Sequence, residues 1–398
     1  MYFTTIIKTI PKKCITECKK LTNITLPMNE SQIIIGNKIF KNQSHLEQDI
    51  YLPTSIEIIN GIEVNKIKME IPTTVTSIDE ECFCGCYKLK QLIIPTTVRT
   101  IPKNTLMKLP ELQELTIKSN KYELNGNRLF YIENECLYSI HLPSSIKKVN
   151  NQEVKSLETF TIPTNVTKLS DYCFTNCDEL SEIKGLEHVK EIGKGCFLNC
   201  SKLNREEYPE IEKNIQDYLN EVVKEEHQKQ LEEWTSLKCD DIVFDSNVDN
   251  WSNETTVFNK RIIGKKQLVF LIEDTDGEIF GYYLNTEVVE KYEGQITDSK
   301  SFHSNLQSKN NRLKQPMKFE IKDLYWGGIQ LFEKSDYYLI LLGDIYLMKE
   351  YYKNGSRCSQ NEDRFDYHGI KNALCGKVGY PDGTDDFTPK RILVIQMK

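Results

Sequence analysis

Apolar and polar positions alternate in short runs through the first half of the chain. Each run has the form Leu-x2-apolar-x-apolar, and most end at a proline, as in Leu89, Leu92, Ile94 and Pro95. This alternation predicts a short strand with one buried face, which the proline ends because it cannot donate to a sheet ladder. The other runs are Leu21, Ile24, Leu26 and Pro27; Leu112, Leu115 and Ile117; Leu137, Ile140, Leu142 and Pro143; and Leu157, Phe160, Ile162 and Pro163.

The runs repeat on two length scales. Their leading leucines recur about every 20 to 25 residues, which is the spacing of leucine-rich repeats. On the longer scale, GNKIF at 36–40 returns as GNRLF at 126–130, and IPTTVT at 71–76 returns as IPTNVT at 162–167, an offset of 90 or 91 residues. We therefore expect a solenoid over residues 1–203, in which a block of several repeats has been duplicated.

Cysteines mark the same repeat. The pattern Cys-x3-Cys-x2-Leu occurs four times and includes eight of the thirteen cysteines. Stacked coils would bury these small thiols at equivalent positions, which favours core packing. A zinc site is disfavoured because no Cys-x2-Cys pair exists, while disulfides stay open if the compartment is oxidising. The four copies are Cys14, Cys18 and Leu21; Cys82, Cys86 and Leu89; Cys173, Cys177 and Leu180; and Cys196, Cys200 and Leu203.

Residues 204–239 have a helical pattern. Apolar side chains recur at spacings of three and four between Glu206 and Leu237, and glycine is absent. This periodicity predicts an amphipathic helix that connects two domains. Its stripe favours docking within the chain over a coiled-coil seam, because charged and amide residues from Glu225 to Gln230 interrupt any heptad.

The remainder, 240–398, reads as antiparallel sheet with a few short helices. Residues 267–273 and 278–283 flank the turn Asp274-Thr275-Asp276-Gly277, which predicts a hairpin. Further strands are predicted at 317–321, 328–332, 337–342 and 391–397, and a short helix at 299–306. Together with the first half, this predicts an α+β chain.

Composition limits the classes of partner. The chain has 398 residues, 39% hydrophobic content and a formal charge of −7, with no block basic enough for nucleic acid. No run approaches the roughly 20 apolar residues that span a bilayer. Lys8 and Pro11 interrupt the mildly apolar N-terminus, so we expect no secretory signal and a cytoplasmic location.

Motifs of the last 160 residues or so resemble the TLDc domain. They keep that family's order along the chain and cover roughly residues 240–398. The motifs are Asp245-Ser246 with Asp249-Asn250-Trp251-Ser252; Ile279-Phe280-Gly281-Tyr282-Tyr283; Ser301-Phe302 with Leu306; Leu342-Gly343-Asp344-Ile345-Tyr346-Leu347; Asn354-Gly355-Ser356-Arg357-Cys358; and Phe387 with Lys390-Arg391-Ile392-Leu393-Val394-Ile395. One departure is the final strand, where many members carry a glutamate and this chain has none.

The Cys-Phe-x2-Cys-x2-Leu units and Ile-Pro stops are similar to BspA-like leucine-rich repeats. The combination resembles amoebozoan proteins with repeats, a helix and a TLDc domain. The resemblance implies an N-terminal leucine-rich-repeat β-solenoid, a connecting helix and a C-terminal TLDc-like antiparallel β-sandwich with short helices. It also implies a role in resistance to oxidative stress, and in some members binding to the vacuolar proton-pumping ATPase.

Catalytic and cofactor chemistry has little support in the sequence. The six histidines form no His-x3-His pair, so neither a metal nor another cofactor is predicted. Asp274-x-Asp276-Gly277 fits a turn better than a calcium loop, because its glycine comes too early. Arg357 could favour the thiolate of Cys358, but no nucleophile has a recognisable base.

Two functions remain open. The favoured one is a non-enzymatic adaptor that binds protein partners on the strand-lined face of the solenoid. The alternative is an enzyme or redox-active protein that uses Cys358 or Cys375 of the C-terminal part. Oligomeric state is not predicted. The candidate partner-binding residues lie beside the core leucines and are Lys90, Gln91, Gln113, Glu114, Glu158 and Thr159.

Overall fold

The chain, analysed as a computed structural model, forms two compact units. The repeat unit comprises Met1–Cys196 with Cys200–Asn204, and the C-terminal unit comprises Phe197–Asn199 with Arg205–Lys398. Both are mostly β-structure, with few helices. The structure describes residues 21–26, 33–35, 38–40, 45–46, 48–51, 56–63, 68–80, 82–83, 86, 88–251, 257–308, 313–325, 327–333, 336–375, 377–378 and 385–398.

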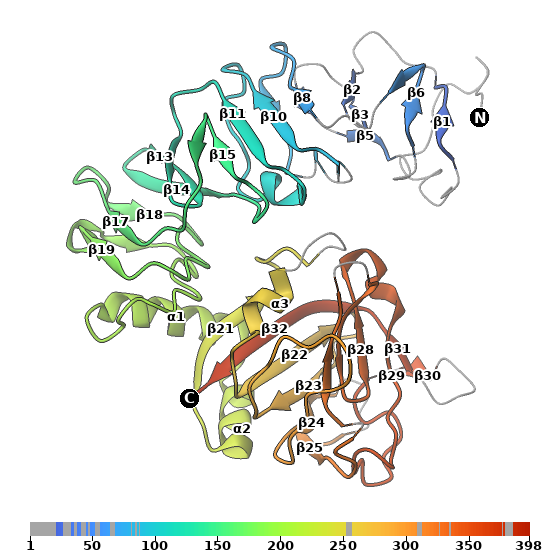
Figure 1. Cartoon of the computed structure of the whole chain (residues 1–398). Coiled ribbons are helices and arrows are strands. Elements are labelled where there is room, and N and C mark those ends of the chain that lie inside the picture. The colour runs from blue at the N-terminus through green and yellow to red at the C-terminus, as the bar shows by residue number, and fades with distance from the viewer. Residues whose placement is uncertain are drawn as a thin grey trace. The chain divides into compact units, whose positions relative to one another are not determined.

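A parallel ladder runs through the middle of the repeat unit (Figure 1). Its strands are β8 (Lys68–Glu70), β10 (Gln91–Ile94), β11 (Glu114–Ile117) and β15 (Lys148–Val149), with antiparallel β16 (Gln152–Glu153) at the edge. Leu92 lies beside Leu115, and Ile94 beside Ile117, both 23 residues further on. All four side chains are buried. The ladder confirms the predicted repeat spacing and the strands that follow Leu89 and Leu112.

The duplication is visible in the strand registers. In the antiparallel hairpin of β2 (Ile33–Ile35) and β3 (Lys38–Phe40), Ile33 lies opposite Phe40. In the hairpin of β12 (Glu123–Asn125) and β13 (Arg128–Glu133), Glu123 lies opposite Phe130, 90 residues later. The other matching strands are β1 (Asn23–Ile24), β5 (Gln48–Tyr51), β6 (Ile58–Ile59) and β7 (Ile62–Glu63), which correspond to β11, β14 (Cys136–His141), β15 and β16.

These hairpins interrupt the predicted solenoid. The described strands of the repeat unit fall into separate sheets of two to five strands rather than one continuous sheet. The run at 137–142 belongs to β14, which pairs antiparallel with β13 as well as parallel with β18 (Lys168–Leu169). Alternation alone predicts a strand but not its partner. The remaining elements are β4 (His45–Leu46), β9 (Ser77–Ile78), β17 (Thr159–Thr161), β19 (Glu182–Lys184), β20 (Glu191–Ile192), η1 (Thr105–Lys108) and η2 (Leu186–His188).

The marker cysteines lie in turns before the strands. The amide of Cys173 donates to the Ser170 carbonyl, that of Cys177 to Phe174, and that of Leu180 to Cys177. Such consecutive turns explain the x3 and x2 spacings of the motif. The predicted burial is confirmed for Cys82, Cys86, Cys173, Cys177, Cys196 and Cys200, which are at most 8% exposed. Cys14, Cys18 and Cys84 lie outside the described residues.

Two antiparallel sheets form the C-terminal unit and share one hydrophobic cluster (Figure 1). The first has the order β21 (Cys239–Asp245), β32 (Pro389–Met397), β22 (Leu268–Asp274), β23 (Ile279–Leu284), β24 (Phe302–Gln307) and β25 (Met317–Glu320). The second has the order β26 (Ile329–Leu331), β27 (Tyr338–Leu342), β28 (Ile345–Met348), β29 (Ser356–Cys358), β31 (Asp385–Phe387) and β30 (Lys377–Val378). Two short helices, α3 (Val257–Ile262) and η3 (Glu350–Gly355), also belong to the unit.

The helix expected at 299–306 is wrong, because most of this segment forms strand β24 between β23 and β25. Its sequence hides the strand, since His303, Ser304 and Asn305 are polar and yet buried. Tertiary hydrogen bonds make this possible: the Asn305 amide donates to the carbonyls of Ala373 and Leu374. Satisfied polar groups can occupy a core that a hydrophobic pattern does not reveal.

Two helices replace the single helix expected between the domains. They are α1 (Pro209–Val222) and α2 (Glu225–Thr235), and Val223 between them has an extended backbone. The break lets Ile215 of α1 and Leu231 of α2 both be buried, although they do not share one face of a continuous helix. The Gln228 side chain donates to the carbonyl of Val223, which satisfies a backbone group freed by the break.

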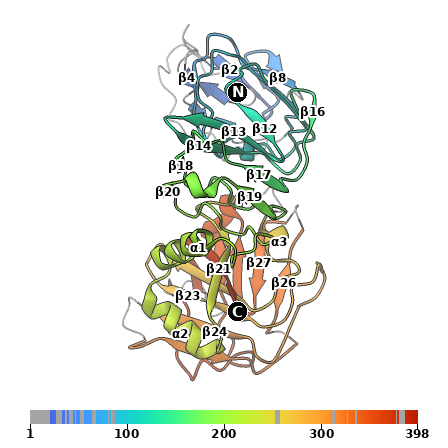
Figure 2. The same ribbon diagram turned by 90° about the vertical axis from the view of Figure 1, so that its left-hand side faces the viewer.

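Both helices cover the outer face of the first sheet (Figure 2). Tyr218 of α1 donates to the Asp245 carboxylate at 2.8 Å, and Arg391 of β32 binds the same carboxylate through two nitrogens at 2.5 and 3.1 Å. Asp245 is 1% exposed, so its charge is held by a bidentate partner inside the unit. This network ties α1 to the sheet, as the prediction of docking within the chain requires.

Candidate functional site: the outward face of the repeat ladder

The parallel ladder lines up one row of polar side chains on its outer face. Lys68, Gln91, Glu114 and Lys148 occupy neighbouring register positions on β8, β10, β11 and β15. The residue after each is buried, so the row itself points away from the core. The row has a cation at each end and one anion, Glu114, inside it, and the amide of Gln91 donates to the Glu114 carboxylate at 2.8 Å.

A second row runs parallel to the first, two residues further along the strands. It consists of Glu70, Ile93 and Thr116, which also lie in register. Just beyond it, the Lys118 ammonium lies 2.8 Å from the Glu70 carboxylate. The two rows form a polar face with one aliphatic side chain at its centre, which we call the ladder face.

The structure brings together only part of the predicted set. Gln91 and Glu114 meet on the ladder face, whereas the carbonyls of Lys90 and Gln113 accept hydrogen bonds from the next coil. Glu158 and Thr159 lie elsewhere: Thr159 is on β17, opposite Glu182 in a separate two-stranded sheet.

Sequence reasoning missed Lys68, Lys148 and Thr116 on the same face. Lys68 precedes Gln91 by one 23-residue step, so the repeat spacing could have identified it. The 23-residue spacing could not identify Lys148, because the hairpin of β12, β13 and β14 lengthens its coil to 34 residues.

Two cations lie near the marker cysteines, Arg128 buried and Lys103 partly buried. Lys103 donates to the Asp171 carbonyl, and Arg128 donates to the Thr175 carbonyl. Burial lowers the pKa of Lys103 to about 8. Burial also raises the pKa of Cys173 to about 12, against the opposing effect of the nearby Lys103 cation. Cys173 is therefore a protonated core thiol rather than a nucleophile.

The C-terminal unit buries a histidine network. His303 Nδ1 lies 2.8 Å from the Tyr367 hydroxyl, and Nε2 lies 2.8 Å from the Leu342 carbonyl. The Tyr367 hydroxyl is also 3.1 Å from Asp344, which pairs with Arg364 at 3.1 Å. Burial lowers the pKa of His303 to about 4. His303, Tyr367 and Asp344 are at most 1% exposed, so their hydrogen bonds belong to the core of the unit.

The cysteines of the redox alternative are also inaccessible. Cys358 lies on β29, and both Cys358 and Cys375 are 0% exposed within the hydrophobic cluster of the C-terminal unit. Within the described part of the chain, no three His, Cys, Asp or Glu side chains are placed to hold a metal ion. None of the described helices has the length and apolarity needed to cross a bilayer.

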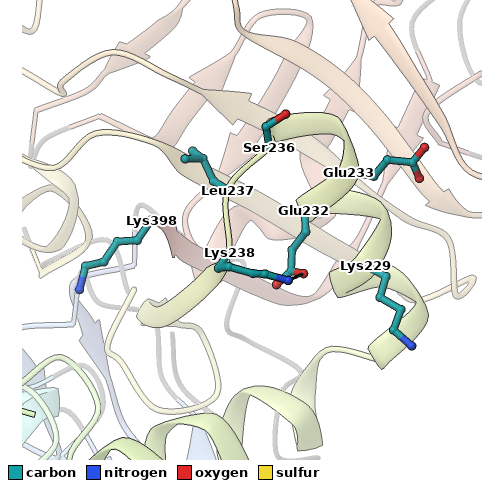
Figure 3. A pocket seen from close by; sticks show the side chains of 7 residues that line it. All are labelled: Lys229, Glu232, Glu233, Ser236, Leu237, Lys238 and Lys398. Carbon is teal, nitrogen blue, oxygen red and sulfur yellow. Dashed lines mark hydrogen bonds and ion pairs between the residues drawn. The ribbon is translucent and has the colours of Figure 1, made fainter. Parts of the chain in front are cut away.

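A hollow of about 400 Å³ lies at the C-terminal end of α2 (Figure 3). Lys229, Lys238 and Lys398 line it, but each cation has a carboxylate partner. The pairs are Lys229 with Glu225 at 2.6 Å, Lys238 with Glu232 at 2.6 Å and Lys398 with Asp240 at 2.8 Å. None of the side chains that line this hollow is aromatic, so it offers no ring surface to a ligand.

Comparison with known proteins identifies the repeats. The BspA type leucine-rich repeat region matches residues 1–61, 62–156 and 133–225, which is more than half of the chain. The chain belongs to the BspA-type leucine-rich-repeat family. No curated protein matches it.

Solved structures also resemble part of the BspA-type chain. A leucine-rich cell surface protein from Faecalibacterium prausnitzii has 22% identity and a TM-score of 0.25, over 48% of this chain and 42% of that protein. A leucine-rich repeat protein from Eubacterium ventriosum has 16% identity and a TM-score of 0.24, over 51% and 58%. One from Bacteroides ovatus has 18% identity and a TM-score of 0.22, over 48% and 50%. The chain thus spans roughly half the length of each.

BspA-type repeats place this chain among proteins whose extended repeat surfaces bind other proteins. The family match and the ladder geometry agree on this general role. The match lies within residues 1–225 and does not extend over the two sheets of the C-terminal unit.

Proposed function

We propose that this BspA-type protein is a non-enzymatic adaptor whose ladder face binds a protein partner. The supporting observation is the register that sets Lys68, Gln91, Glu114 and Lys148 side by side with outward side chains. A rigid backbone presents this row, so binding need not order the face first. The mixed charges of the row favour a partner that sets carboxylates against Lys68 and Lys148 and a cation against Glu114.

Charge reversal on the ladder face tests the proposal. In the full chain, we expect Gln91→Arg with Glu114→Arg to reduce capture of its main partner from a cell extract by about tenfold or more, because two cations replace the centre of the row. Quantitative mass spectrometry of the captured proteins is the measurement. The matched control is Glu187→Arg on η2, whose side chain is 71% exposed and which lies outside the ladder. Equal capture by the face variant and the wild type would show that another surface binds.

The C-terminal unit is proposed to be a TLDc domain. Its antiparallel sheets and the motif order from Asp245 to Ile395 support this assignment. The assignment implies a role in oxidative-stress resistance and binding to the vacuolar proton-pumping ATPase. A cytoplasmic location is proposed as well. Purified pump should then bind the full chain equally well with and without the ladder-face substitutions. If neither the wild type nor the ladder-face variant binds the pump, this part of the proposal is wrong. The proposal for the ladder face would still stand.

The absence of catalysis is part of the proposal. The burial of Cys358 and Cys375 supports it, because an oxidant cannot reach either thiol in the folded chain. We expect both thiols to react slowly with a thiol reagent under native conditions and rapidly in urea, as followed by mass spectrometry. Rapid native modification of Cys358 would instead favour a redox function.

A further inference from the structure

A second hollow in the C-terminal unit has a different chemical character. Its volume is about 500 Å³, and it lies between the C-terminal end of α2 and the outer face of β23, β24 and β25. Aromatic, cationic and hydroxyl side chains line it together, among them Trp234, Tyr283, Phe302, Lys300, Lys318 and Ser301. This volume is within the range of small-molecule sites.

Three aromatic rings form one wall of the hollow. The rings of Tyr283 and Phe302 have centroids 5.1 Å apart, and Trp234 meets Phe302 edge to face at 6.1 Å. Tyr283 and Phe302 are each 4% exposed, whereas Trp234 is only partly buried. The indole of Trp234 therefore supplies an accessible surface against which a planar ring can pack.

The cations beside this wall can accept a new anionic partner. Lys318 lies 5.5 Å from the Phe302 ring centroid and pairs with Glu320 at 2.7 Å. The Glu320 side chain is 69% exposed, and the attraction in an ion pair this exposed is weak because water screens it. A ligand anion can thus replace Glu320 at small cost. Lys300 adds a second, exposed cation at the rim.

The loop that carries Lys300 is held in position by Asp298. Its carboxylate accepts hydrogen bonds from the amides of Thr286 at 2.9 Å and Lys300 at 2.7 Å, and from the Ser301 hydroxyl at 2.9 Å. These donors satisfy the carboxylate through local backbone and hydroxyl groups. The rim of the hollow is therefore ordered before any ligand arrives.

We propose that this hollow binds a small molecule that joins a planar ring to an anionic group, as a nucleoside monophosphate or an aromatic carboxylate does. The ring packs on Trp234, and the anion lies between Lys318 and Lys300. The hollow of Figure 3 shares Ser236 and Leu237 with this site, but none of its lining side chains is aromatic. The proposal concerns the C-terminal unit and does not depend on partner binding by the ladder face.

Calorimetric titration of the full chain tests the site with four probes. Adenosine 5′-monophosphate and benzoate carry both features, while adenosine lacks the anion and inorganic phosphate lacks the ring. We expect one of the first two to saturate with a dissociation constant below about 1 mM, and adenosine and phosphate to bind about tenfold more weakly. Whichever of these two compounds binds more tightly shows whether the site prefers a phosphate or a carboxylate as its anion. Equal affinity for phosphate alone, or no saturation by either compound, overturns the proposal.

Substitutions locate the binding. We expect Lys318→Gln and Lys300→Gln each to weaken binding about fivefold or more, and Trp234→Leu to weaken it while Trp234→Phe retains most of it, since phenylalanine keeps a ring. Lys371→Gln is the matched control, because Lys371 is exposed in the same unit and does not line the hollow. Each variant is checked for an unchanged unfolding midpoint. Wild-type affinity in both lysine variants contradicts the assignment.

Discussion

Single residues in this protein illustrate how far burial changes the behaviour of a polar group. His303 is fully buried in strand β24, and both of its ring nitrogens have partners. The Leu342 carbonyl can only accept, so Nε2 carries a proton toward it. In the neutral ring Nδ1 is an acceptor 2.8 Å from the Tyr367 hydroxyl, whose single proton also has the Asp344 carboxylate as an acceptor 3.1 Å away. Desolvation disfavours the charged ring, and its pKa falls to about 4.

This shift predicts a pH dependence of stability. The folded pKa lies below the ordinary value of 6.5, so unfolding takes up a proton as pH falls below 6.5, and stability is lost progressively down to about pH 4. We expect the histidine to lower the free energy of unfolding of the C-terminal unit by about 2 kcal/mol between pH 7 and pH 5. Urea titrations followed by tryptophan fluorescence measure it.

The control for this prediction is His303→Asn, which removes the titrating group from the core. Its free energy of unfolding is expected to be lower at pH 7 but to change less between pH 7 and pH 5 than that of the wild type. Parallel pH profiles for the two proteins would mean that other groups cause the dependence.

At the scale of elements, the duplicated hairpins show what a repeat must preserve. The two-residue loop Gly126-Asn127 joins β12 to β13, and Gly126 has a φ of +59°. A Cβ at this position would lie 2.5 Å from the Cα of Leu157. Glycine is therefore required at position 126 for two reasons: the left-handed backbone conformation and the close approach of the next coil.

Replacing this glycine should destabilise the repeat unit strongly. We expect Gly126→Ala to cost about 3 kcal/mol or more, because the backbone of Leu157 must move. The matched control is Gly61→Ala, where φ is +80° but no atom lies within 4 Å of the added Cβ. There the cost should be only about 1 to 2 kcal/mol, from the backbone conformation alone. Urea unfolding followed by far-ultraviolet circular dichroism measures both, and equal costs would contradict the steric argument.

At the scale of the whole molecule, each compact unit has a hydrophobic cluster of its own. One extends from Met69 to Val149 in the repeat unit, and the other from Val243 to Val394 in the C-terminal unit. All three tryptophans, Trp234, Trp251 and Trp326, belong to the C-terminal unit. Tryptophan fluorescence therefore reports on that unit, whereas circular dichroism reports on both.

Separate clusters predict separate unfolding. We expect the fluorescence and circular dichroism transitions of the wild type in urea to have different midpoints, because each core loses its packing independently. Gly126→Ala should shift the dichroism curve and leave the fluorescence midpoint in place. Coincident curves that shift together in this variant would show that the two units unfold as one.

The sequence by itself determined the features that depend on neighbouring residues and on repetition. The spacing of Leu89, Leu92 and Ile94 returns at Leu112, Leu115 and Ile117, and GNKIF returns 90 residues later as GNRLF, so strands, period and duplication could all be predicted. Cysteine spacing likewise reflected consecutive turns, which are local structures.

Only the tertiary structure decided what depends on distant partners. Strand β24 was hidden because its polar side chains bond to groups about 40 to 70 residues away, as Asn305 does with Ala373. The break between α1 and α2 depends on the sheet that both helices cover. The place of Lys148 beside Glu114 depends on the hairpin inserted between them in the sequence. Contacts between residues distant in the sequence determine which of several local structures of similar energy forms, and the local sequence pattern does not show which one.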